Sequence, residues 1–392
     1  MRPSYGAWGV VLLCLLPLVF LPETEGKRGA DIVAGPYLQQ VTSSEITFRW
    51  ITDRPATENR VYWGLSPHNL TLARGAPNRE WHEVTVTGLQ PSTSYWYRVT
   101  SDDMESSLYT FRTAPGNEDS VTIIAYGDSR GVWDDWRNAS LVARAIEQER
   151  ARVVINTGDL VASGGEEEQW IRFFQVASFS HNATLYPALG NHDLPAGNLR
   201  RFFSLPHNER WYAVDYGPCH LVVLDSTLPY GLSLGQYLWL LSAVQTEKPW
   251  TVVVFHHPPY SSGAHGGTLH TRLLWAPLFR TQGVDLVLNG HDHDYEHLIV
   301  QGLHYVVTGG GGAPLRPVGS GQWTQQTHST YHYCRVTASG SALEVAALEP
   351  DGKLLDRFTV GESRGAGMPR ACGLSVWWLL WYAACTEWLT IG

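Results

Sequence analysis

The chain has 392 residues, enough for two or three domains that each bury a core. Its 44% hydrophobic and 17% charged residues exclude a disordered or low-complexity protein. The formal net charge of −9 argues against a nucleic-acid-binding protein, which needs a basic face, so we expect no nucleic-acid partner.

Residues 1–26 have the pattern of a secretory signal peptide. Arg2 precedes an apolar run from Trp8 to Leu21, and Thr24-Glu25-Gly26 offers a cleavage site. An uncleaved membrane anchor is the alternative, but the run is short for a bilayer span. We therefore expect a secreted or otherwise extracytoplasmic protein, in which three Asn-x-Ser/Thr sequons would permit glycosylation: Asn69, Asn138 and Asn182.

Residues 31–115 alternate apolar and polar side chains with a period of two. Ile46, Phe48 and Trp50 would face one way and the residues between them the other, and turn residues punctuate the segment. This pattern predicts a seven-stranded, fibronectin-III-like β-sandwich. Because the segment has no paired carboxylates and no histidine cluster, we expect it to brace the next domain, with carbohydrate or partner binding as the alternative.

Residues 119–361 combine apolar β-type runs with helical segments, which predicts an α/β domain whose central strands are buried on both faces. The expected strands are Val121–Tyr126, Val153–Asn156, Tyr186–Leu189, Leu221–Asp225, Thr251–Phe255 and Asp285–Asn289. Apolar residues at helical spacing predict helices near 139–146, 170–177 and 237–241. Alternating segments between 331 and 360 predict terminal strands of the same domain.

Short polar motifs directly follow these expected strands. They are Gly127-Asp128-Ser129-Arg130, Gly158-Asp159, Gly190-Asn191-His192-Asp193, His256-His257 and Gly290-His291-Asp292-His293. Because the carboxyl ends of strands in an open α/β sheet form the ligand-binding crevice, the five motifs should meet at one rim. Glycine at the start of four of them would let the chain turn tightly beneath each ligand.

The residues gathered in this way suit a metal centre. Carboxylates and imidazoles form a mixed shell for two divalent or trivalent metals, and a bridging carboxylate can hold such ions about 3.5–4 Å apart. Between the ions a water would lose its proton near neutral pH, and the ions would neutralise charge on phosphate oxygens. One such motif is most often an ordinary turn, but five in order after apolar strands predict two-metal hydrolase chemistry.

Two features leave alternatives open. Cys219 and Cys334 either pair or remain buried thiols. In residues 362–392, an apolar stretch from Ala371 has the length of a bilayer span, but no Lys or Arg follows it. Small residues such as Ser363 and Gly365 upstream fit a removable lipid-anchor signal, so this tail could attach the protein to a membrane, or it could be an untethered tail. The oligomeric state is open as well.

The motifs, in this order, resemble those of the calcineurin-like metallophosphoesterases. The preceding sandwich, with Gly35-Pro36-Tyr37-Leu38 and Val86-Thr87-Gly88-Leu89-Gln90-Pro91, is similar to the N-terminal domain of purple acid phosphatases. The resemblance extends from Ala34 to Val360. It implies an α/β catalytic domain of two packed mixed β-sheets flanked by helices, and a purple-acid-phosphatase-like activity.

The resemblance also implies roles for individual residues. Asp159 would bridge two metal ions, and the remaining ligands would be Asp128 and His293 at the first position and Asn191, His256 and His291 at the second. His192 would assist the leaving oxygen, with Asp193 orienting it, and His265 would face the substrate. Glu296 occupies the family's usual supporting position.

Two positions depart from the family pattern. Purple acid phosphatases carry, three residues after the bridging aspartate, a tyrosine whose phenolate binds iron(III) and gives the colour, and Ala162 stands there. Other metallophosphoesterases have a histidine two residues after the first aspartate, and Arg130 stands there. We therefore expect a colourless enzyme, with iron and a second ion of iron, zinc or manganese as the implied pair. Arg130 would either bind a substrate phosphate or form a structural ion pair with a rim carboxylate.

The sequence thus predicts a two-metal, acid-phosphatase-like phosphohydrolase in which a metal-bridging hydroxide attacks small phosphate monoesters. A phosphodiesterase on the same scaffold is one alternative. A metal-binding surface protein without turnover is another, since the first metal position has lost ligands.

Overall fold

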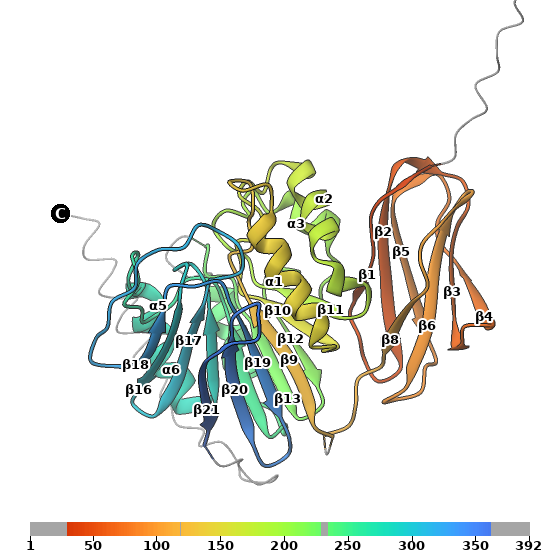
Figure 1. Cartoon of the computed structure of the whole chain (residues 1–392). Coiled ribbons are helices and arrows are strands. Elements are labelled where there is room, and N and C mark those ends of the chain that lie inside the picture. The colour runs from red at the N-terminus through yellow and green to blue at the C-terminus, as the bar shows by residue number, and fades with distance from the viewer. Residues whose placement is uncertain (1–29, 118, 229–233, 362–392) are drawn as a thin grey trace, which may run out of the picture.

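The computed structural model describes residues 30–117, 119–228 and 234–361. The expected signal peptide and C-terminal tail lie outside these residues. Figure 1 shows a β-sandwich beside a larger part in which sheets and helices are layered. Within the described residues, no helix is both long enough and apolar enough to cross a bilayer.

The sandwich has eight strands in the described residues rather than the seven expected. They are β1 (Ile32–Gln39), β2 (Glu45–Ala56), β3 (Asn59–Ser66), β4 (Asn69–Arg74), β5 (Arg79–Thr87), β6 (Ser94–Ser101), β7 (Met104–Glu105) and β8 (Tyr109–Arg112). The predicted alternation holds, because Phe48 faces Tyr97 and Phe111 of the other sheet, with ring centroids 4.6 and 5.4 Å away. The additional strand is the two-residue β7, which is too short to leave a periodic signal.

The sandwich shares a sheet with the larger part. One sheet runs in the order β21-β20-β19-β9-β10-β11-β1-β2-β5, and β1 pairs in parallel with β11 at Leu38 and Thr184. Tyr37, also on β1, stacks on Phe174 at 3.9 Å between ring centroids and donates a hydrogen bond to the Phe202 carbonyl at 2.5 Å. The sandwich is therefore packed firmly against the part of the molecule that holds the polar motifs.

The larger part contains two sheets. In addition to β1, β2 and β5 of the sandwich, the nine-stranded sheet contains β9 (Val121–Tyr126), β10 (Val153–Asn156), β11 (Thr184–Pro187), β19 (Tyr333–Ala338), β20 (Leu343–Leu348) and β21 (Leu354–Val360). A seven-stranded sheet contains β12 (Tyr212–Tyr216), β13 (Cys219–Val223), β14 (Trp250–Val254), β15 (Leu286–Asn289), β16 (Tyr295–Val300), β17 (Leu303–Thr308) and β18 (Thr324–His328).

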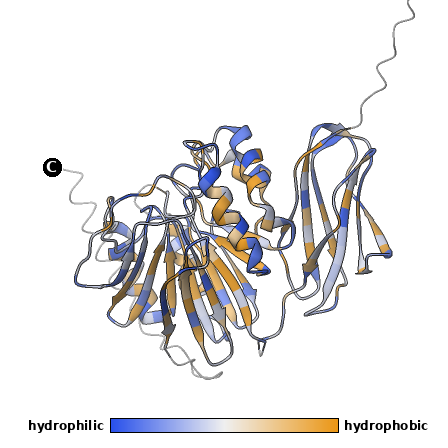
Figure 2. Cartoon of the chain, in the orientation of Figure 1, coloured by the Kyte–Doolittle hydropathy of each residue, from blue (hydrophilic) through white to orange (hydrophobic). Residues whose placement is uncertain are grey.

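Side chains of β14 show how the layers stack. Val252 and Val254 lie in the core shared with the nine-stranded sheet, whereas Val253 lies in a second core on the opposite face. That second core is covered by helices, and Figure 2 shows apolar residues concentrated along the strands. The helical segments are α1 (Arg137–Gln148), α2 (Glu167–Val176), the 3-10 turn η1 (Ser178–His181), α3 (Gly197–Phe202), α4 (Leu234–Ala243), α5 (Leu269–Leu274) and α6 (Ala276–Gln282).

The predicted class, two packed mixed sheets flanked by helices after a β-sandwich, is confirmed. β9 and β10 have the expected bounds, whereas the other expected strands before residue 300 are displaced by one or two residues. β12, β16, β18, α3, α5 and α6 carried no clear periodic signal in the sequence and were not expected. Among the described residues, Cys219 and Cys334 are both free thiols, buried on strands of different sheets, and burial raises the pKa of each thiol to about 12.

Candidate metal centre

The predicted rim exists, because β9, β10 and β11 are parallel neighbours in one sheet and β14 and β15 in the other. Asp128, Asp159 and His291, each in a loop just after a strand, have positive backbone φ angles of 54°, 57° and 73°. Such left-handed conformations are uncommon outside glycine and are found where a fold holds a side chain in one direction. Each loop therefore turns sharply enough to aim its side chain at the rim.

Two glycines let these loops approach closely. A Cβ atom on Gly190 would lie 2.2 Å from Oδ1 of Asp159, and one on Gly290 would lie 2.5 Å from Oδ2 of Asp128. Only a residue without a side chain fits at either place. The glycines that precede Asn191 and His291 are thus explained by packing against the two aspartates.

One cluster joins Asp128, Asp159 and His256. All three side chains are buried, and one potential ligand atom from each lies within 4.8 Å of the others. His256 donates from Nδ1 to the Thr157 carbonyl at 3.0 Å, which leaves Nε2 facing the carboxylates. Asp128 Oδ1, Asp159 Oδ2 and His256 Nε2 are buried and have no hydrogen-bond partner among the described residues. These three buried donor atoms, which make ion-pair contacts at 3.4–3.5 Å but no hydrogen bonds, form a cradle that suits a cation.

The charges of this cluster are strongly coupled. Burial, together with the charge of Asp159, raises the pKa of Asp128 to about 8. For Asp159, burial is outweighed by His256 and Arg130, and the pKa is lowered. For His256, burial is likewise outweighed by the two carboxylates, which raise its pKa to about 9. A cation bound here would replace the proton as the positive charge.

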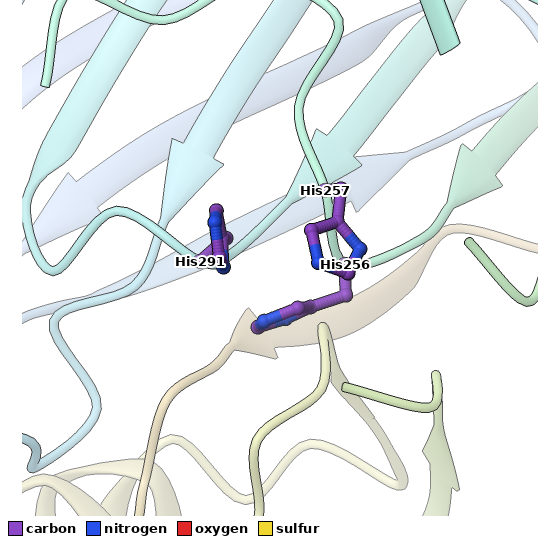
Figure 3. A group of neighbouring side chains, drawn as sticks. All are labelled: His256, His257 and His291. Atoms are coloured by element: carbon purple, nitrogen blue, oxygen red, sulfur yellow. The ribbon is translucent and has the colours of Figure 1, made fainter. Parts of the chain in front are cut away.

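A second cluster joins His256, His257 and His291. Their nitrogens lie within 4.8 Å of one another, and Figure 3 shows the three imidazoles beside the ends of the strands. His257 was not predicted as a site residue, although it adjoins His256 in the sequence. It is held by Ser226, whose hydroxyl lies 2.9 Å from His257 Nδ1. Burial and the nearby charge of His256 lower the pKa of His257 to about 3, so its imidazole is neutral and can donate a lone pair.

Arg130 lies inside the rim. Its Nη2 donates to Nε2 of His293 at 2.8 Å, and its Nη1 lies 3.4 Å from Oδ2 of Asp159. His293 Nε2 is in turn 3.5 Å from Oδ1 of Asp128. Of the two alternatives for Arg130, the structure contains the ion pair with a rim carboxylate.

His192 and Asp193 lie in the loop after β11. His192 donates from its backbone N–H to Oδ1 of Asp159 at 2.8 Å and from ring Nδ1 to the Ala162 carbonyl at 3.0 Å. No hydrogen bond joins the Asp193 carboxylate to the His192 ring among the described residues, so a role of Asp193 in orienting His192 stays a prediction. The Asp193 carboxylate instead accepts four backbone N–H groups, from Asp159, Leu160, Val161 and Gly190. Asp193 therefore ties the loop after β10 to the loop after β11. Asn191, in the loop after β11, is exposed.

His265 stacks on His291, with ring centroids 4.2 Å apart. Its Nδ1 donates to the buried carboxylate of Asp292 at 2.9 Å, and its Nε2 accepts from Arg316 at 2.8 Å. Asp292 and Arg316 were not among the predicted site residues, because only the folded chain brings them to His265. Glu296 has a supporting role, since it accepts hydrogen bonds from Ser261 Oγ at 2.5 Å and Ser262 N at 2.6 Å and so holds the loop that leads to His265.

Comparisons with known proteins bear on this site. The family described as calcineurin-like phosphoesterase matches residues 121–295, and the N-terminal domain of purple acid phosphatase matches residues 36–113. The chain is a purple-acid-phosphatase-like member of the calcineurin-like metallophosphoesterases. Human acid phosphatase type 7 is 27% identical over 76% of this chain and 78% of its own length. A soybean purple acid phosphatase is 25% identical over 68% of this chain and 65% of its own length.

Solved structures agree on the fold. A purple acid phosphatase from yellow lupin seeds superposes with a TM-score of 0.75 at 21% identity, over 83% of this chain and 74% of its own. As a member of the calcineurin-like metallophosphoesterases, the chain is a metal-dependent phosphatase with a centre for two metal ions. An Arabidopsis relative, 24% identical over 64% of this chain, is named an Fe(3+)-Zn(2+) purple acid phosphatase.

The residues of this metallophosphoesterase fit the two metal positions unequally. The cradle of Asp128, Asp159 and His256 fits a cation, because its inward atoms are oxygen and nitrogen donors that make no hydrogen bond among the described residues. On the side of His293, the guanidinium of Arg130 contacts the donor atoms. The tyrosine expected of purple enzymes is replaced by Ala162, whose carbonyl binds His192.

Proposed function

We propose that this protein is an extracytoplasmic phosphatase that hydrolyses small phosphate monoesters. The observation that carries the proposal is the buried cradle of Asp128, Asp159 and His256, whose three inward atoms lack hydrogen-bond partners among the described residues. The bound metal ions would supply a water activated near neutral pH and would neutralise charge on the phosphate. The relatives named acid phosphatase and purple acid phosphatase favour monoesters over diesters.

Each site residue has a proposed role on this basis. Asp159 would be shared by both metal ions, with Asp128 and His293 on one side and Asn191, His256 and His291 on the other. His192 would give a proton to the leaving oxygen from Nε2, because its Nδ1 proton is engaged by the Ala162 carbonyl. Arg316, paired with the substrate-facing His265, would place positive charge and N–H donors beside the substrate phosphate.

Hydrolysis of p-nitrophenyl phosphate and of bis-p-nitrophenyl phosphate, with added manganese, zinc or iron, tests the reaction. We expect faster hydrolysis of the monoester, loss of activity after chelation, and loss in Asn191→Ala. Asn117→Ala, which removes an exposed asparagine of the linker, serves as the control with unchanged activity. Faster hydrolysis of the diester would favour the phosphodiesterase, and tight metal binding with no hydrolysis of either ester would favour the surface protein.

The extracytoplasmic location is proposed from the signal-peptide pattern and the sequons. Asn69 is exposed on β4, so it is the sequon most accessible to a glycan. Asn138 donates from Nδ2 to the Tyr331 hydroxyl, and Asn182 accepts from Thr110 N, so both amides are engaged in the fold. Enzymatic deglycosylation should make the wild type migrate faster on a gel and should leave the migration of Asn69→Gln unchanged. This result would support an extracytoplasmic location. Phase partition of the full chain and of a chain ending at Arg370 would show whether the tail attaches it to membranes.

A further inference from the structure

We propose that the guanidinium of Arg130 competes with a metal ion for the first metal position, so that the two positions of the centre load unequally. The proposal rests on the proposed function in taking Asp128, Asp159 and His293 as the ligands of that position. It concerns the order and strength of metal binding, which can be measured without any turnover.

The guanidinium contacts the donor atoms that a metal ion would need. Arg130 Nη2 lies 2.8 Å from His293 Nε2, and Nη1 lies 3.4 Å from Asp159 Oδ2. His293 donates its Nδ1 proton to the Pro314 carbonyl at 2.7 Å, so Nε2 has a single lone pair to offer. That lone pair is given to Arg130. A metal ion bound to His293 Nε2 would need the same lone pair at a distance of about 2.0–2.1 Å, so Arg130 and the metal ion cannot both use it.

Charge strengthens the competition. Arg130 is 3% exposed and sits beside two buried carboxylates, so it supplies positive charge where a metal ion would otherwise supply it. The position has also lost the phenolate expected at Ala162, which leaves a metal ion fewer ligands with which to displace the guanidinium.

The Arg130 guanidinium nevertheless lacks some of its possible hydrogen bonds, and an exposed aromatic ring lies close enough to contact it. Its Nε and Nη1 atoms are buried without a hydrogen-bond partner in the described part of the chain, which weakens its hold on the position. Its central carbon lies 5.4 Å from the ring of Trp133, and Trp133 is 56% exposed. A metal ion that enters the first position would push the guanidinium toward this ring, where cation–π contact can receive it.

Calorimetric titration with zinc ions alone tests the proposal on the metal-stripped full chain, together with the metal content retained after gel filtration. The wild type should retain about one zinc ion, with a second equivalent bound at least about 100-fold more weakly, because a charge within about 4 Å of a dication changes binding by two or more decades. Arg130→Gly should retain about two and bind the second about 100-fold more tightly than the wild type. Arg130→Lys, which keeps a positive charge, should behave like the wild type.

Arg152→Gln is the matched control, since Arg152 lies at the opposite end of β10 and its loss should leave zinc binding unchanged. Arg130→Gln is the second variant if Arg130→Gly does not fold, and it should also tighten the second equivalent. Two equivalents of equal affinity in the wild type would overturn the proposal, and so would a weak second equivalent in both neutral variants. Unequal loading without hydrolysis of either ester would refute the phosphatase and leave this inference standing.

Discussion

Replacing Asp193 with asparagine should loosen the metal centre without replacing any proposed metal ligand. Oδ2 of Asp193 accepts the N–H groups of Asp159 and Gly190, each at 2.9 Å. Oδ1 accepts those of Leu160 at 2.8 Å and Val161 at 3.2 Å. The side chain is fully buried, so water cannot replace these bonds.

The magnitude follows from the geometry. Asparagine has one oxygen, and its NH2 group would face two N–H donors that it cannot accept. Two hydrogen bonds to a charged group are lost at about 1.5–3 kcal/mol each, so we expect a loss of about 3–6 kcal/mol in the free energy of unfolding. Because the bonds join the loops that hold Asp159 and Asn191, zinc affinity should also fall by about 10–100-fold.

Denaturant unfolding and zinc calorimetry measure the two effects. Burial and the charge of Asp159 raise the pKa of Asp193 to about 7, so the wild type is measured near pH 8, at which this carboxyl group is ionised. Asp102→Asn is the control, because Asp102 accepts the N–H groups of Thr57 and Glu58 in the sandwich, far from the rim. A loss of less than about 1 kcal/mol in the free energy of unfolding of Asp193→Asn would refute this prediction, and so would a zinc affinity equal to that of the control.

Three further results are expected. Zinc should raise the melting temperature of the metal-stripped wild type and should raise that of His256→Ala much less. Equal shifts in the two proteins would exclude His256 as a metal ligand. Iron(III) should leave the wild type colourless, whereas Arg130→Gly with Ala162→Tyr should acquire a visible absorption band; a coloured wild type would show that another ligand supplies the chromophore. Burial lowers the pKa of His332 to about 4. As the pH falls, His332 of the unfolded chain therefore binds a proton before His332 of the folded chain does. Its contribution to the free energy of unfolding is full above about pH 6.5 and falls as the pH drops toward 4, by about 2 kcal/mol at pH 5. Urea unfolding of His332→Gln should lack this contribution, and identical pH dependence in both proteins would refute it.

The sequence alone predicted most of the strands that lead to the rim, and the residues Asp128, Asp159, His256 and His291 that the fold gathers there. Apolar runs such as 121–126 and 153–156 are local signals, and the motifs that follow them are read from neighbouring residues. The rule that strand ends share a rim then predicts that Asp128 and Asp159 meet. These inferences need no knowledge of side-chain direction.

The tertiary structure decided which partner each side chain takes. Arg130 could bind substrate or a carboxylate, and its ion pair depends on where Asp159 and His293, the latter 163 residues away, place their atoms. Asp193 adjoins His192 in sequence but points to the backbone of the loop after β10. Periodicity reports which face of a strand is buried and carries no information about contacts between distant loops, which arise only when the sheets pack together.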